Sequence, residues 1–128
     1  MTAGLAATTL ANKWLDMLGA SAFSAPAAFW VQLHIGDPGA AGTSNQSAVT
    51  TRQQVTWSAA SGGSKSEASA PTNWNMTTTE TISHISCWDA NAAGNFLLSA
   101  ALSVSRNVVN LDQVKLNTLT IALTPIAA

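Results

Sequence analysis

Charged side chains are scarce in this sequence. Only 9% of its 128 residues are Asp, Glu, Lys or Arg, and their charges sum to a formal net charge of -1, whereas about a quarter of a typical soluble domain is charged. Five basic residues cannot neutralise a row of phosphates, so nucleic acid is excluded as a main partner. A net charge near zero also removes the repulsion that keeps copies apart, so we expect a subunit of an assembly.

Cysteine is almost absent as well. Cys87 is the only one, which excludes an internal disulfide and leaves a cysteine-based zinc site without ligands. Its immediate neighbours are Ser86 and Trp88, and no nearby Lys or Arg lowers the pKa of its thiol. We therefore expect Cys87 to be buried as a small hydrophobic residue and not to act as a nucleophile.

Long apolar segments are missing too. No run approaches the roughly 20 apolar residues that span a bilayer, and no basic region followed by a continuous apolar core stands near the N-terminus. We expect a soluble, unprocessed intracellular product with no membrane partner. A length of 128 residues fits one domain, over residues 1–128, that buries a core of its own.

The N-terminal segment has the spacing of an amphipathic helix. Apolar residues, Trp14 and Leu18 among them, recur every three or four positions, which predicts a helix over residues 2–18. Thr2 can cap its start and Gly19 can end it. The apolar stripe either closes one end of the chain's own sheet or docks on a neighbouring subunit. A linker of small residues follows.

The clearest strand is predicted in FWVQLHI, residues 29–35. Two sets of residues alternate there, which is typical of a strand with one face packed inward. The next four residues, GDPG, predict a tight turn. We expect one set to face the core, Phe29, Val31, Leu33 and Ile35, and the other to face outward, Trp30, Gln32 and His34.

More short strands are predicted between turns along the rest of the chain. They cover residues 49–57, 65–70, 74–76, 82–88, 96–102, 114–116 and 119–124. Segments 82–88 and 96–102 form an antiparallel hairpin around residues 89–95. For 82–88 either face could be buried, because Ile82, His84 and Trp88 compete with Ile85 and Cys87. The pattern predicts a mainly β fold, a single antiparallel β-sandwich or jelly roll over residues 29–124 behind the helix.

Residues for catalysis or metal binding do not form a pattern. His34 and His84 each precede an aspartate by a few residues, but this spacing is looser than in metal-binding motifs. GDPGAAG, residues 36–42, lacks the Lys and Ser or Thr of a phosphate-binding loop, and no serine stands in a nucleophile elbow. We predict a protein that is not an enzyme and has no metal or cofactor.

Five tryptophans are the remaining signal. Core packing is the default for most of them, although exposed tryptophans can also bind sugars or anchor a subunit interface. Trp30 is the exception, since it is expected on the outward face. The candidate subunit interface comprises Trp14, Leu18, Trp30, Gln32 and His34.

The helix, the small-residue linker through Ala25 and Pro26, and four later segments carry a family resemblance. The four segments, WVQLHIGDPGAAGTSN, TRQQVTW, SHISCWDA and GNFLLSAAL, resemble, in this order, a family of small actinobacteriophage virion proteins whose members read ALHTGDPG, ARQAVTW, THVGIWDA and GNLLWSGAL. These are usually labelled tail fibre or minor tail proteins. The chain departs from them at His34, where Thr is common, and at Ser86 and Cys87, where Gly and Ile are common.

The resemblance implies a non-enzymatic structural protein of the phage virion, assembled in the host cytoplasm. Its partners would be copies of itself and other virion proteins, such as major capsid or tail proteins. Small β-sandwich proteins of this sort are also similar to capsid decoration or cement proteins, so head and tail both stay open. An alternative is a carbohydrate-binding module that uses its tryptophans to contact a glycan of the host cell envelope.

Overall fold

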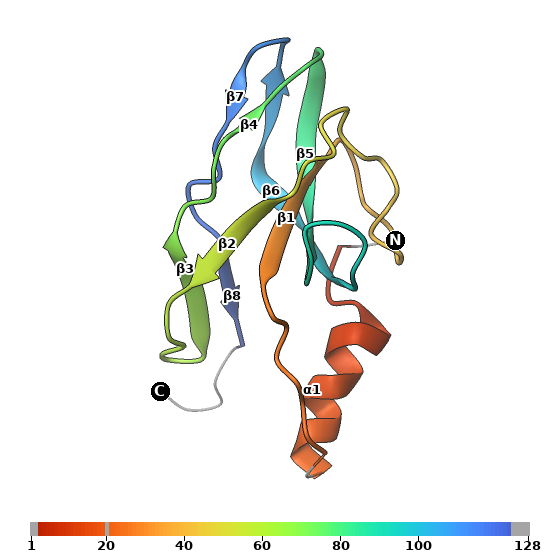
Figure 1. Ribbon diagram of the computed structural model, residues 1–128, viewed down its shortest axis with the longest axis vertical. Helices are drawn as coiled ribbons and strands as arrows, with labels where there is room; N and C mark the ends of the chain where they lie inside the picture. Colours follow the sequence, from red (N-terminus) through yellow and green to blue (C-terminus); the bar gives the residue numbers. More distant parts are fainter. Residues whose placement is uncertain (1–2, 20, 124–128) are drawn as a thin grey trace.

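The structure is a computed structural model that describes residues 3–19 and 21–123. It is mainly β, with antiparallel strand pairs and a short helical segment at the N-terminus, as predicted (Figure 1). The helical segment consists of η1 (Ala7–Ala11), α1 (Asn12–Asp16) and η2 (Met17–Gly19). The strands are β1 (Phe29–His34), β2 (Gln53–Trp57), β3 (Ser64–Ser69), β4 (Trp74–Asn75), β5 (Glu80–Trp88), β6 (Phe96–Val108), β7 (Gln113–Val114) and β8 (Thr120–Ala122).

Most strands form one curled sheet in the order β6-β5-β1-β2-β3-β8, and β4 pairs with β7 in a second, two-stranded sheet. In Figure 1 the β4–β7 pair lies at the end of the molecule opposite α1. Strand β1 is central, since Trp30 pairs with Trp88 of β5 on one side and with Gln54 of β2 on the other. The jelly-roll alternative and the single-domain organisation stay predictions.

The core fills the inside of the curled sheet. Trp74 of β4 and Met76, just after this strand, are each 1% exposed. The indole nitrogen Nε1 of Trp74 donates a hydrogen bond to the carbonyl of Thr51 at 2.9 Å. A buried indole needs such a partner for its N–H. The strand pairs bring together the other large buried apolar residues, Val31, Leu33, Val55, Ile82, Ile85, Leu97, Leu98, Val108 and Leu119.

The β5–β6 hairpin and its turn are confirmed, but β6 is longer than predicted. It continues from the expected end at Leu102 to Val108, with a register shift opposite the segment between Ile82 and His84. A bulge of this kind inserts unpaired residues and bends the strand without ending the pairing. Both faces of 82–88 are buried in part, since Ile82 and Trp88 of one competing set and Ile85 and Cys87 of the other are all buried.

The prediction that β1 has one outward face is wrong. Gln32 is 2% and His34 0% exposed, whereas Ile35, expected in the core, is 46% exposed. The cause is the segment 35–52, which folds back over β1. Its backbone bonds to the strand, from the Ser47 N–H to the carbonyl of Leu33 at 3.2 Å and through a bridge between His34 and Gln46.

The helical segment begins later than predicted. Residues 4–6 extend along β6 instead, where the Ser99 N–H donates to the carbonyl of Gly4 at 2.8 Å and the Ala6 N–H to that of Leu97 at 2.7 Å. These bonds occupy the residues that would form the first helical turn, so helix starts at Ala7 and ends at Gly19 as predicted. Thr2, the expected cap, lies outside the described residues. None of the described helices is long and apolar enough to cross a membrane.

Candidate functional site

A buried polar cluster lies on the face of β1 that was expected to be exposed and on the adjoining face of β5. We call it the His34 cluster; it contains Gln32, His34, Arg52, Ser86 and Trp88. The β1–β5 register pairs Gln32 with Ser86 and Trp30 with Trp88, so side chains of both strands meet on this face. Segment 35–52 covers them. The cluster was missed in the sequence because its members are far apart along the chain.

Hydrogen bonds in the cluster run in one direction. The Trp88 Nε1–H donates to Ser86 Oγ at 2.8 Å, and Ser86 Oγ lies 2.7 Å from Nε2 of His34. His34 Nδ1 is 2.8 Å from the carbonyl oxygen of Ser44. A carbonyl only accepts, so Nδ1 carries a proton. In the neutral ring Nε2 then accepts from the Ser86 hydroxyl, and the two bonds tie segment 35–52 to β5.

The electrostatics favour the same state. Burial is the largest effect on His34 and lowers its pKa below the ordinary value; backbone hydrogen bonds at Ser44 and Asn45 act against it, and the nearby His84 and Arg52 act with it. Arg52 donates to Gln32 Oε1 at 3.1 Å and to the carbonyls of Ala90 and Ala93 at 2.9 and 2.7 Å. Its guanidinium carbon lies 3.9 Å from the centre of a Trp88 ring, a cation–π contact. Burial lowers the pKa of Arg52 while Asp89 raises it.

The Ser86–His34 pair has the spacing of a nucleophile and its base. Both residues are 0% exposed, however, and the group that orients the histidine is a backbone carbonyl. A substrate has no path to the Ser86 hydroxyl, which already accepts from Trp88. The cluster can hold a loop in place, but its geometry gives it no means of turnover.

The other candidate residues are also used locally. The structure pairs His34 with His84 across β1 and β5, but Asp37 accepts from the Gly39 N–H and Asp89 from Asn95. Within residues 3–19 and 21–123, no group of three His, Cys, Asp or Glu could hold a metal ion. Cys87 is buried as predicted, and burial raises the pKa of its thiol.

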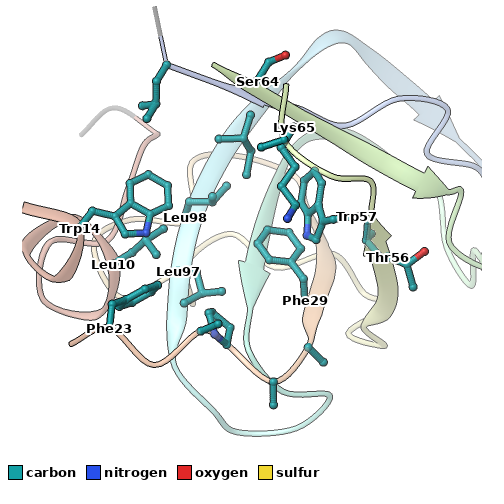
Figure 2. Close-up of a pocket in the computed structure, with 18 of the residues that line it drawn as sticks. Leu10, Trp14, Phe23, Phe29, Thr56, Trp57, Ser64, Lys65, Leu97 and Leu98 are labelled. Atoms are coloured by element: carbon teal, nitrogen blue, oxygen red, sulfur yellow. The ribbon is translucent and has the colours of Figure 1, made fainter. Parts of the chain in front are cut away.

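An apolar groove of about 600 Å³ opens between the helical segment and the sheet. One wall consists of Trp14 and Phe23, the opposite wall of Phe29 and Trp57, and Leu97 and Leu98 lie between them (Figure 2). The Phe29 and Trp57 rings meet edge to face with centroids 4.9 Å apart. The groove has a volume within the range of roughly 300–1,000 Å³ that is usual for binding clefts.

The local sequence explains why the groove is open. The linker after the helix passes along its rim through Ala25, Pro26, Ala27 and Ala28, and such small side chains cannot fill the space between helix and sheet. Lys65 of β3 is the one charged residue among the lining residues, and it extends toward the Phe29 and Trp57 rings (Figure 2). The groove is therefore apolar with a single ammonium group.

The last turns of the helical segment carry apolar side chains that contact little of the chain. Leu15 is 65% exposed, Met17 52% and Leu18 84%. We call residues 15–18 the helix tip. In Figure 1 this end of the helix extends away from the sheet, beyond the start of β1. Only the first half of the apolar stripe predicted along the helix therefore packs on the rest of the chain. Leu10 is buried and Trp14 is half-buried, whereas the tip is exposed.

A family model described as Podophage GP4 fiber I protein gp80 matches residues 5–124. The chain belongs to this family. Membership makes it a fibre-type structural protein of the phage virion that associates with other virion components. No curated protein matches the chain. The predicted origin in an actinobacteriophage stays a prediction.

The predicted interface residues of this fibre-family chain differ in their exposure. Leu18 is exposed, and Trp14 and Trp30 are half-buried, so all three keep accessible surface. Gln32 and His34 belong to the buried cluster and present no surface to a partner, which corrects their assignment as interface residues. The sequence analysis missed the groove, although the apolar ends of β1 and β2 were a signal for it.

Proposed function

We propose that this protein is a fibre subunit that assembles with copies of itself and with other virion proteins through its helical end. The observation that carries the proposal is the apolar surface gathered there, where the exposed helix tip and the apolar groove lie at the same end of the chain. Contiguous exposed apolar surface on a soluble protein usually marks an interaction site. A fibre subunit needs such surfaces because it works by burying area against its neighbours, not by turnover.

The low charge supports the same reading. With 9% charged residues and a net charge of -1, ion pairs can supply little of the association energy, and copies do not repel one another strongly. Apolar burial stabilises an interface by about 25 cal/mol per Å² before the costs of association are subtracted. Trp30, half-buried on β1, is proposed as a second contact, with another virion protein.

A capsid-decoration role differs from a fibre role only in the partner that the helical end meets. Labelled-antibody electron microscopy of virions distinguishes the two. Label on the tail fits the proposal, whereas label over the capsid would replace the fibre by a decoration protein.

Carbohydrate binding has less support. A sugar platform needs an aromatic face open to solvent and polar partners for the sugar hydroxyls. Trp74 and Trp88 are buried, Trp30 is half-buried, and the half-buried Trp14 and Trp57 line a groove that is mostly apolar. We expect no binding of the isolated protein to a glycan array or to host cells. Binding that is lost when Trp30 or Trp57 is replaced by Ala would favour a host-glycan role instead.

The direct test of the proposal is self-association. Sedimentation velocity and light scattering of the wild-type chain over a wide concentration range should show a species larger than the monomer. Leu18→Glu should weaken that association, because it places a charge in an apolar contact. A wild-type chain that stays monomeric at every concentration would contradict assembly through copies of itself.

A further inference from the structure

We infer that the helix tip of one subunit occupies the apolar groove of a second copy, with Asp16 of the tip facing Lys65 of the groove. This inference rests on the proposed function, since it names the partner and the contact through which copies assemble. The occupant is residues 15–18 of a neighbouring copy.

Size and chemistry match between the two parts. The tip presents Leu15, Met17 and Leu18, which are all more than half exposed, and the groove has about 600 Å³ of space lined mostly by apolar and aromatic residues. The chain's own helix cannot fill this space with its tip, because Trp14 already forms one wall and the tip continues away from the sheet (Figures 1 and 2).

Charge complementarity selects this occupant. Covering Lys65 with a purely apolar segment would remove its ammonium group from water without compensation, which is costly. The occupant must therefore carry an acceptor or a negative charge close to its apolar side chains. Asp16 is the acidic residue of the tip, next to Leu15 and Met17 in the sequence. Successive helical side chains point about 100° apart, so Asp16 meets Lys65 when the tip enters the groove with its end and not with one side.

Asp16 also differs from the other acidic residues. Asp37, Glu67, Glu80, Asp89 and Asp112 each accept a hydrogen bond through the side chain from a backbone or side-chain group of the chain. Among the contacts between described residues, the Asp16 carboxylate accepts none. Within residues 3–19 and 21–123, the one acidic side chain that accepts no hydrogen bond is thus the one carried by the tip.

A contact between two different surfaces of the same chain can repeat. If tip and groove of each copy engage different neighbours, the result is a ring or an open filament, since each added copy leaves one tip and one groove free. This is the heterologous arrangement from which an elongated particle component can be built.

The test uses two variants that each destroy one half of the contact. Leu18→Glu breaks the tip and leaves the groove intact, while Ala60→Trp fills the groove and leaves the tip intact. Ala60 lines the groove and is exposed, as is Leu18, so both variants should fold. Leu111→Glu is the matched control: Leu111 is 84% exposed, the same as Leu18, in the turn between β6 and β7 at the opposite end (Figure 1).

We expect each broken variant alone to self-associate on the order of 100-fold more weakly. Leu18→Glu loses one buried leucine and covers a charge, whereas Ala60→Trp occupies the space that the tip needs. Leu111→Glu should associate like the wild type. An equimolar mixture of Leu18→Glu and Ala60→Trp should form a complex of twice the chain mass in light scattering, because one intact tip meets one intact groove.

Three results would overturn the inference while the proposed self-assembly stands. The mixture could stay monomeric although the wild type associates, or Leu18→Glu could associate as tightly as the wild type, so that the tip is not used. Association lost in Ala60→Trp but kept in Leu18→Glu would place another segment in the groove. A monomeric wild type would instead defeat the proposed self-assembly itself.

Charge exchange tests the register of the contact. Asp16→Lys and Lys65→Asp should each weaken association roughly tenfold, because like charges then face each other. The double variant restores opposite charges and should recover the wild-type affinity to within about threefold. A double variant as weak as the sum of the two single effects would show that Asp16 and Lys65 do not meet.

Discussion

The His34 cluster and the apolar groove are built on the same central strand but are completed in opposite ways. On the cluster side, segment 35–52 folds back and supplies partners for buried polar groups, so that Ser44 accepts from His34 and Arg52 donates to Gln32. On the groove side, a linker of small residues leaves aromatic rings open. All but one of the buried side-chain polar atoms in the described residues have a partner within the chain, the exception being Nε2 of Gln32, whereas apolar surface is left for a second chain.

The difference follows from what each kind of group requires. A buried donor or acceptor without a partner costs about 1–3 kcal/mol, so polar groups must be paired when the monomer folds. An exposed apolar side chain lowers the stability of the monomer little and can be buried later, when copies associate. Regions that look alike in a strand pattern therefore have different roles: the first fixes a loop, and the second offers a contact.

Gly42→Ala should have the largest effect on the monomer, because it prevents the loop from covering the cluster side. A Cβ at this position would lie 2.4 Å from Cδ2 of Phe96, and the backbone φ angle of Gly42 is +72°. We expect a loss of about 3 kcal/mol in the free energy of unfolding, measured with urea, from overpacking and left-handed backbone strain together.

Gly62→Ala is the matched control for that variant. Gly62 also has a positive φ, +59, but nothing lies within 4 Å of an added Cβ, so only the backbone strain remains, about 1 kcal/mol. Equal losses in the two variants would mean that the Gly42–Phe96 contact does not hold the loop.

Ser86→Ala should have the next largest effect. It leaves the Trp88 indole N–H and the Nε2 of His34 without their partner in a buried site, which costs about 2 kcal/mol. Urea unfolding measures the loss, and the exposed Ser105 of β6, changed to Ala, should stay within about 0.5 kcal/mol of the wild type. A neutral Ser86→Ala would show that water replaces the hydroxyl.

Lowering the pH should reduce the free energy of unfolding, because His34 of the buried cluster becomes protonated when the chain unfolds. Because burial lowers its pKa in the folded protein, the unfolded chain binds the proton more readily, and the stability from neutral His34 is complete above the ordinary pKa of about 6.5. It is lost as the pH falls from there toward the lowered value, with a slope of at most about 1.4 kcal/mol per pH unit for one proton.

His34→Gln removes this titration, so its free energy of unfolding should depend less steeply on pH than that of the wild type between pH 7.5 and 5. Urea titrations at several pH values give both slopes. Parallel profiles for the two proteins would show that His34 does not take up the proton on unfolding.

Leu18→Glu should have the smallest effect on the monomer. With 84% of its surface exposed, Leu18 contributes little to the fold, and the free energy of unfolding at high dilution should change by less than about 0.5 kcal/mol. Its effect should appear in association instead. A large loss of monomer stability would mean that the tip packs on its own chain, and the contrast between the two regions would disappear.

Strand positions were largely readable from the sequence. Alternation identified residues 29–35, because side chains on successive strand positions point to opposite faces whatever the fold. Turn residues indicated the hairpin around 89–95 and the short polar strand predicted at 65–70. Burial of Cys87 also followed from its neighbours. The extension of β6 was not readable, since its polar second half pairs only because a bulge keeps it beside β5.

The candidate site was predicted only in part. Leu18 and Trp14 came from helical spacing, and the helical end does expose apolar surface. Gln32 and His34 were misplaced because alternation distinguishes two faces but does not reveal which of them a distant segment covers. Trp57 packs against the core and also lines the groove, which needs the helix and the sheet to be placed together.

The sequence by itself determined the mainly β class, the presence of an N-terminal helical segment, and the small net charge that favours association, because these depend on local periodicity and composition. Only the tertiary structure decided which faces are closed. Segment 35–52 returns over β1 and pairs polar groups from residues as distant as His34 and Ser86, whereas the linker at 25–28 leaves a groove. Such long-range closure depends on backbone paths and contact geometry, and these have no signature at neighbouring positions.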